Sequence, residues 1–130
     1  MPMSPKNNNA RELTKAEEQI MHAIWKIEKG FAKDIHDQLK DPKPAYNTVL
    51  TVIRVLCEKG FVKFNTYGKA NEYYPAIQKS DYSSQRLNAL KKNYFNNSNA
   101  QLLSFFVKEN KLNLDELDQI LKLIKKEKNG

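Results

Sequence analysis

The sequence predicts a mainly α-helical protein with a small β-hairpin wing, followed by a region made of helices alone. Three observations support this fold class. Within residues 12–77, three helical patterns precede two short strand-like stretches. The third helix pattern separates an apolar face from a face of short or planar polar side chains. Residues 78–130 contain only helical patterns. We therefore expect residues 12–77 and 78–130 to form two functional parts, after a flexible, polar N-terminal arm over residues 1–11.

Composition limits the class of protein. The 130 residues carry 22 basic and 15 acidic side chains, a net charge of +7 that favours an anionic partner. The single Cys57 cannot form an internal disulfide. No apolar run approaches the roughly 18 residues of a membrane span, and the N-terminus lacks the apolar segment of a signal peptide. We expect a cytoplasmic protein without membrane insertion.

The first helix is expected to start at Thr14, because Thr14-Lys15-Ala16-Glu17 has the pattern of a capping box. Its apolar face is expected to contain Leu13, Ala16, Ile20, Ile24 and Ile27. Lys29-Gly30 should end it. A second helix is predicted over about residues 32–40, and Asp41-Pro42-Lys43-Pro44 should break it.

The third helix, about residues 45–59, has two distinct faces. Its apolar side chains cluster on one side: Val49, Val52, Ile53 and Leu56. The opposite side carries Asn47, Thr51, Arg54 and Glu58. In a chain whose basic residues include only three Arg, a merely solvated face would be expected to carry Lys. Asn, Thr and Arg suit hydrogen bonds to base edges, so we predict that this face reads DNA, with the Thr51 methyl against a thymine and its hydroxyl donating to an acceptor.

After Gly60 the hydrophobic pattern changes to the period of a strand. Residues 61–66 and 70–74 are predicted to pair as a hairpin around a turn at Tyr67-Gly68-Lys69. Three helices followed by a hairpin is the order of a winged helix-turn-helix domain. In that fold the third helix enters the major groove and the hairpin tip lies against the DNA backbone.

The remaining helices are expected to form a homodimer. A stripe of apolar side chains lies on a helix starting near Asp81, a second set covers nearly the whole circumference of a short helix, and a third lines a helix capped by Asn113 and Glu116. About 50 residues cannot bury that much apolar surface alone, and two-fold dimers are the commonest solution. The alternative is a monomer in which these helices pack back on residues 12–77. The predicted dimerisation residues are Leu87, Leu90, Tyr94, Leu102, Phe105, Phe106, Leu117 and Leu121.

Several stretches in this order resemble the penicillinase-repressor family of bacterial transcriptional regulators (BlaI/MecI/CopY type). The resemblance covers about residues 12–126. The matching stretches are Leu13-Thr14-Lys15-Ala16-Glu17 with Ile24-Trp25, Tyr46-Asn47-Thr48-Val49-Leu50-Thr51-Val52-Ile53-Arg54, Glu58-Lys59-Gly60-Phe61-Val62, Tyr67-Gly68-Lys69 and Tyr73-Tyr74-Pro75.

The resemblance implies a dimeric winged-helix repressor that binds an inverted-repeat operator in double-stranded DNA. By position, Thr48 and Thr51 match helix residues that face the bases, and Lys69 matches a basic residue at the wing tip. Family members usually carry a basic residue one place after Arg54, where this chain has Val55. The operator sequence is therefore expected to differ from that of better-known members.

A second departure concerns induction. In the antibiotic-resistance members a membrane sensor triggers cleavage between an Asn and a Phe, which makes a membrane sensor or protease a further implied partner. Aligned on Lys111-Leu112-Asn113, that bond falls at Phe105-Phe106, where the Asn is missing. The departure argues against the same cleavage here. The cysteine pairs of the copper-responsive branch are also missing, which disfavours metal sensing.

No pattern of catalytic or metal-binding residues stands out, so we expect neither an enzyme nor a cofactor or metal site. His22 and His36 lack further ligands at helical spacing, whereas zinc sites need three or four. A set of acidic residues along the second helix is best explained as a solvated face: Asp34, Asp37 and Asp41. Two alternative functions stay open, a winged-helix protein–protein interaction module and a small-molecule-gated regulator.

Overall fold

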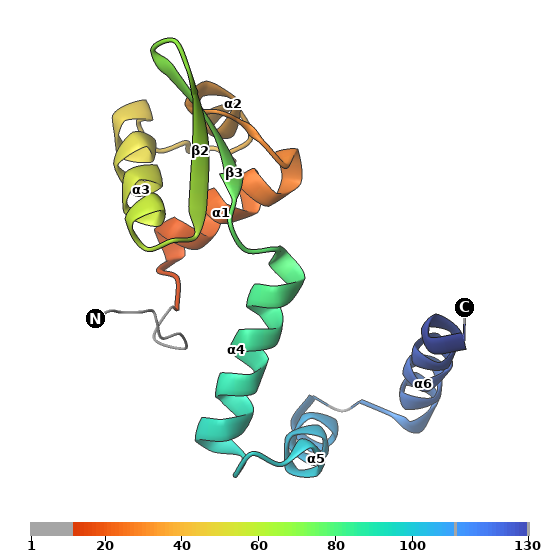
Figure 1. The fold of residues 1–130 in the computed structure, drawn as a ribbon. Coiled ribbons are helices and arrows are strands. Elements are labelled where there is room, and N and C mark those ends of the chain that lie inside the picture. The colour runs from red at the N-terminus through yellow and green to blue at the C-terminus, as the bar shows by residue number, and fades with distance from the viewer. Residues whose placement is uncertain (1–11, 111, 130) are drawn as a thin grey trace. The chain divides into compact units, whose positions relative to one another are not determined.

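The computed structural model describes residues 12–110 and 112–129 (Figure 1). The predicted N-terminal arm, residues 1–11, lies outside the described residues. The chain divides into two compact units, one extending to Arg86 and one starting at Leu87. None of the helices in the described ranges combines the length and apolar character needed to cross a bilayer.

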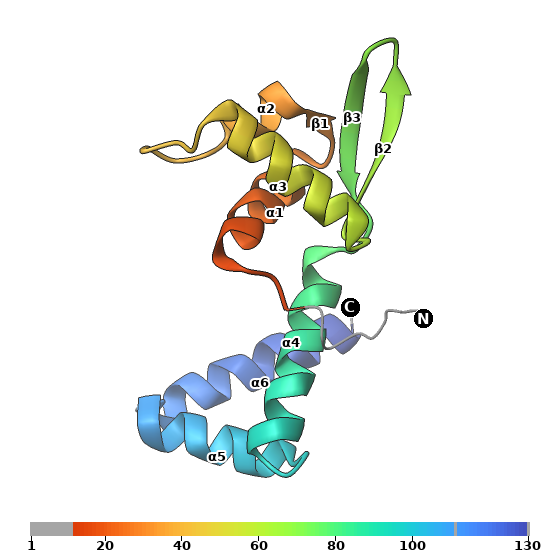
Figure 2. The same cartoon turned by 90° about the vertical axis from the view of Figure 1, so that its left-hand side faces the viewer.

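The first unit contains the predicted helices and hairpin. Its elements are α1 (Lys15–Ile27), β1 (Gly30–Phe31), α2 (Ala32–Asp37), α3 (Tyr46–Glu58), β2 (Val62–Tyr67), β3 (Ala70–Pro75) and the beginning of α4 (Lys79–Tyr94). The strands form an antiparallel sheet in the order β1-β3-β2. In both views the β2–β3 hairpin projects beyond the helices (Figures 1 and 2). This arrangement confirms the predicted winged-helix fold class.

Helix α1 begins as its capping box predicts. The Thr14 hydroxyl accepts from the Glu17 backbone N–H at 3.1 Å, and Glu17 Oε1 accepts from the Thr14 N–H at 3.0 Å. The predicted apolar face is wrong at Ala16, which is exposed. The buried face is rotated slightly about the helix axis, so that Glu17 and Met21 lie in the interior instead.

Two further differences from the sequence prediction have local causes. Helix α2 ends at Asp37 and not near Lys40, because the N–H groups of Gln38 and Leu39 bond to carbonyls only three residues back, at 3.1 Å each. Strand β1 was not predicted. It has two residues and exists through pairing with β3, Gly30 opposite Tyr73 and Phe31 opposite Glu72.

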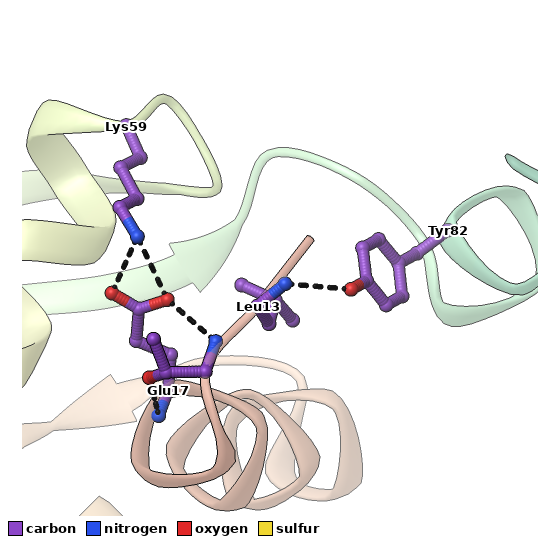
Figure 3. Close-up of polar contacts among 5 residues, drawn as sticks. Leu13, Glu17, Lys59 and Tyr82 are labelled. Atoms are coloured by element: carbon purple, nitrogen blue, oxygen red, sulfur yellow. Dashed lines mark hydrogen bonds and ion pairs between the residues drawn. The ribbon is translucent and has the colours of Figure 1, made fainter. Parts of the chain in front are cut away.

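The core of the first unit lies among α1, α2, α3 and the sheet. Its buried apolar side chains are Leu13, Ile20, Met21, Ala23, Ile24, Ala32, Ile35, Leu39, Val49, Ile53, Leu56, Phe61, Val62 and Tyr82. Tyr82 brings the start of α4 into this core. Its ring contacts Trp25 and Phe61, and its hydroxyl accepts from the Leu13 N–H at 2.9 Å (Figure 3).

One ion pair, between the buried Glu17 and the half-buried Lys59, joins the beginning of α1 to the end of α3. Lys59 Nζ donates to both carboxylate oxygens of Glu17, at 2.9 and 2.7 Å (Figure 3). Burial by itself raises the pKa of Glu17. The hydrogen bonds from Lys59 and from the Thr14 N–H outweigh burial, so the pKa lies below its ordinary value of 4.5.

The second unit consists of the rest of α4, α5 (Asn99–Asn110) and α6 (Leu114–Asn129). Helix α4 stops at Tyr94 because Asn96 and Asn97 adopt positive φ values of 51° and 58°, a conformation that Asn tolerates. Helix α6 has the predicted cap. Asn113 Oδ1 accepts from the Glu116 N–H at 2.8 Å, and the Glu116 carboxylate accepts from the Asn113 N–H at 3.0 Å.

We predict that Glu17→Gln destabilises the first unit by about 1–3 kcal/mol at pH 7, because it removes a charge-assisted bond to Lys59. Since the folded-state pKa is lowered, this stabilisation is present above the unfolded pKa and is lost as pH falls through the folded pKa. Urea unfolding followed by fluorescence of Trp25, the chain's one tryptophan, measures the effect. Glu18→Gln on the exposed side of α1 is the matched control. A difference from wild type that stays constant from about pH 7 to pH 3 would contradict the pKa assignment.

Candidate nucleic-acid interface

Helix α3 is held in the first unit by one face. Val49, Ile53 and Leu56 on that face are fully buried, whereas Val52 is half-buried. These side chains pack in the core shared with α1, α2 and β2. Burial of one stripe fixes which side of the helix is presented to solvent.

The opposite face of α3 is exposed and polar. The four helix residues predicted to contact DNA, Asn47, Thr48, Thr51 and Arg54, are all exposed. No hydrogen bond or ion pair engages the Arg54 guanidinium within the described part of the chain. Its five donors are therefore available to an acceptor outside the protein. The structure brings the four residues onto one helix, and their contact with DNA stays a prediction.

Thr51 differs from the expectation in one respect. Its hydroxyl donates to the Asn47 backbone carbonyl at 3.0 Å, within the same helix. The predicted donation to an external acceptor is therefore not available in this rotamer. The exposed Thr51 side chain keeps its methyl group and an oxygen that accepts hydrogen bonds. It can contact a thymine methyl or accept from a base amino group.

The loop before α3 is fastened by side chains to which sequence reasoning gave no role in this site. His36 Nε2 lies 2.9 Å from the Pro44 carbonyl, and its ring contacts that of Tyr46 edge-on. Lys43 Nζ donates to the Asp37 carbonyl at 3.3 Å. These contacts join the end of α2 to the start of α3. No local sequence pattern predicts these contacts, because they depend on how the Pro-rich loop folds back.

The wing presents Lys69 at the tip of the hairpin. Gly68 adopts a φ of 63°, which glycine accommodates without steric cost, and Lys69 follows it on the exposed turn. Across the strands, Phe64 packs against Tyr73, and the Thr66 hydroxyl donates to Asn71 Oδ1 at 2.8 Å. The strands therefore hold the tip in a defined conformation, with the Lys69 ammonium in solvent.

The second unit has a different character, because none of its described side chains is buried. The predicted dimerisation residues share this exposure. Leu87, Leu90, Tyr94, Phe105, Phe106 and Leu121 are exposed, and Leu102 and Leu117 are half-buried. Phe105 contacts Phe95 with ring centroids 5.3 Å apart. So many exposed large apolar side chains are typical of an interface.

Other reactive groups in the described ranges do not assemble into a site. Burial raises the pKa of the half-buried Cys57 thiol, and the neighbouring Glu58 carboxylate raises it further, which disfavours the reactive thiolate. Among the residues described, no three His, Cys, Asp or Glu side chains are placed to hold a metal ion.

Known proteins resemble this chain in sequence and in fold. The sequence pattern of the penicillinase repressor family matches residues 13–126. The methicillin resistance regulatory protein MecI of Staphylococcus aureus (strain N315) is 30% identical over 125 residues, which cover 92% of this chain and 98% of that protein. MecI of Staphylococcus epidermidis is equally similar, and MecI of Mammaliicoccus sciuri is 29% identical over the same share of each chain. A solved structure, the complex structure of hsRosR-SG, shares the fold with a TM-score of 0.52 at 16% identity, over 95% of this chain and 98% of that one.

Proposed function

Because the chain belongs to the penicillinase repressor family of transcriptional regulators, we propose that it is a repressor that binds an inverted-repeat operator in double-stranded DNA as a homodimer. The observation that carries the proposal is the exposed polar face of α3 opposite a fully buried one. Because a repressor acts where the DNA of a bacterium lies, the proposed role is a cytoplasmic one.

The chemistry of the α3 face supports reading of bases. The Arg54 guanidinium has the fork geometry that pairs with O6 and N7 of a guanine. Thr48 and Thr51 lie in the first half of the helix, where recognition helices make most base contacts. Lys69, at the wing tip, has the point charge suited to a phosphate. The alternative for Arg54 is a contact with phosphate, because the residue lies past the middle of α3, away from the turns that make most base contacts.

The exposed apolar surface of the second unit supports the homodimer. Removing apolar surface from water is favourable by about 25 cal/mol per Å², and part of this gain is offset by the freedom that two chains lose when they associate. In a single chain, the exposed large apolar side chains on α4, α5 and α6 leave 41–81% of their surface in solvent. A two-fold dimer covers the same surface on both copies and matches an inverted-repeat operator. Release by a membrane sensor is not part of the proposed role, because the bond aligned with the family's cleavage site, Phe105–Phe106, has no Asn.

Arg54→Lys is expected to weaken operator binding by about 1–3 kcal/mol and to relax the preference at one position in each half-site, because Lys cannot form the two-point contact with guanine. The test selects a duplex from a random pool with the wild-type protein. Binding of wild type, Arg54→Lys and Arg54→Ala to its single-base variants is then measured. If all three proteins rank the variants identically, Arg54 contacts phosphate, and Thr48 and Thr51 become the better candidates for base reading.

Lys69→Ala is expected to weaken binding to every duplex by a similar factor, because a contact with the backbone carries no sequence information. The slope of log affinity against log salt concentration should become shallower by the amount that corresponds to about one phosphate contact. Lys92→Ala, at an exposed position of α4, removes the same charge away from the wing and is the control. Loss confined to duplexes that differ at one base pair, with an unchanged salt slope, would show that Lys69 reads sequence.

Phe106→Asp is expected to shift the protein from a dimer toward a 15.1 kDa monomer, because a buried unpaired carboxylate is costly at an interface. Phe106 is 44% exposed in the single chain, so the charge does not disrupt its interior. Sedimentation at micromolar concentration measures the mass. Ser104→Asp, at an exposed position of the same helix, controls for added charge. A wild-type protein that sediments as a folded monomer would refute the proposed dimer.

A further inference from the structure

A pocket of about 340 Å³ lies in the first unit, between α1 and the residues that follow α2. Its volume is within the range of small-molecule sites. Helix α1 and the turn after α2 both line it, with Gln19, His22, Ala23, Lys26, Gln38, Leu39 and Lys40. It shares no residue with the α3 face or the wing tip described above.

The charge of this pocket has a single sign. Lys26 and Lys40 supply ammonium groups, His22 an imidazole, and Gln19 and Gln38 amide donors. Among the described residues that line it, none carries a carboxylate. Two cations beside donor groups favour a carboxylate or phosphate group, which can accept several charge-assisted hydrogen bonds at once.

These polar side chains are also available. In the described ranges, the side chains of Gln19, Lys26, Gln38 and Lys40 make no hydrogen bond or ion pair. Lys59, by contrast, is engaged with Glu17. The His22 ring is oriented by an edge-on contact with Trp25, with centroids 5.5 Å apart. The donors therefore do not have to break internal contacts to bind a ligand.

The floor of the pocket is apolar. Ala23 and Leu39 are 5% and 6% exposed, and both belong to the core of the unit. Cations around an apolar floor suit a ligand with an anionic group and an apolar body. The phosphate of DNA is flanked by deoxyribose, whose oxygens match an apolar floor less well than a hydrocarbon body does, which favours a small molecule over the backbone of DNA.

We propose that this pocket binds a small organic anion, with a carboxylate or phosphate group held by Lys26 and Lys40 and an apolar body on Ala23 and Leu39. This site goes beyond the proposed DNA-binding role, because it uses none of the residues assigned to that role. Its ligand would contact residues 38–40, where the connection from α2 to α3 begins.

Titration of the ¹⁵N-labelled full chain, followed by NMR, tests the proposal with defined probes. Benzoate and phenyl phosphate present the two anionic groups on the same apolar ring, so the tighter of the two identifies the preferred group. Inorganic phosphate lacks the ring, and benzyl alcohol lacks the charge. Saturable shifts at residues 19–26 and 38–40 are expected for benzoate or phenyl phosphate, with affinity about tenfold above that of either incomplete probe. Absence of saturable shifts at these residues would overturn the proposal.

Paired variants separate the pocket from general charge. The double variant Lys26→Ala with Lys40→Ala is expected to bind the anion about tenfold more weakly, or weaker still. Lys33→Ala with Lys92→Ala removes the same charge from exposed positions outside the pocket and should leave the affinity unchanged. If both double variants bind the anion equally weakly, the loss of affinity reflects net charge alone, and the proposed site is overturned. The pocket pair should also bind duplex DNA with the wild-type salt slope. A slope lowered by about two phosphate contacts would assign these lysines to the DNA backbone and refute the proposal.

Discussion

The packing of α3 on α1 is the constraint on which the rest of the first unit depends. Val49, Ile53 and Leu56 are buried completely, so the helix cannot rotate about its axis without exposing apolar side chains. The Glu17–Lys59 ion pair adds a polar link between the start of α1 and the residue after α3, at the edge of the same core. Because rotation is blocked on the buried side, the orientation of the opposite face is fixed as well. A helix that presents side chains to a regular, repeating surface such as DNA needs this kind of fixed orientation.

The two units solve the problem of burying apolar surface differently. The first closes a core on itself and includes Tyr82 from the start of α4, whose hydroxyl accepts from the Leu13 N–H. The second buries none of its described side chains, although its helices carry many large apolar residues. The capping contacts of Ser98 and Asn113 fix where α5 and α6 begin. The apolar side chains are therefore exposed although the helices themselves are regularly formed. Tertiary packing provides most of the stability of helices this short. In the proposed dimer the second copy supplies that packing.

Sequence reasoning succeeded where the determining contacts are local. The Thr14–Glu17 and Asn113–Glu116 caps span three residues, and the buried face of α3 follows from helical spacing, so both could be predicted. It failed where a contact joins distant residues. Glu17 and Lys59 are 42 positions apart, and β1 forms only because β3 lies beside it. The exposure of Asn47, Thr48, Thr51 and Arg54 agrees with their predicted role, but the bond from Thr51 to its own helix shows that periodicity places a side chain without fixing its rotamer.

The distribution of charge suggests how affinity and specificity divide in the proposed complex. The exposed face of α3 carries one cation, Arg54, and one anion, Glu58, so it adds almost no net attraction to DNA. The net charge of the chain is +7, so the cations that attract DNA have to lie on other elements. Examples are the exposed Lys43 before α3 and the exposed Lys63 and Lys69 on the wing. Contacts from such lysines release counterions and strengthen binding to any duplex. A nearly neutral face binds a wrong DNA sequence weakly, because its hydrogen-bonding groups find partners only when the base edges match them. Placing the attraction on the loop and wing and the discrimination on α3 lets one small domain hold DNA of any sequence weakly and its operator tightly.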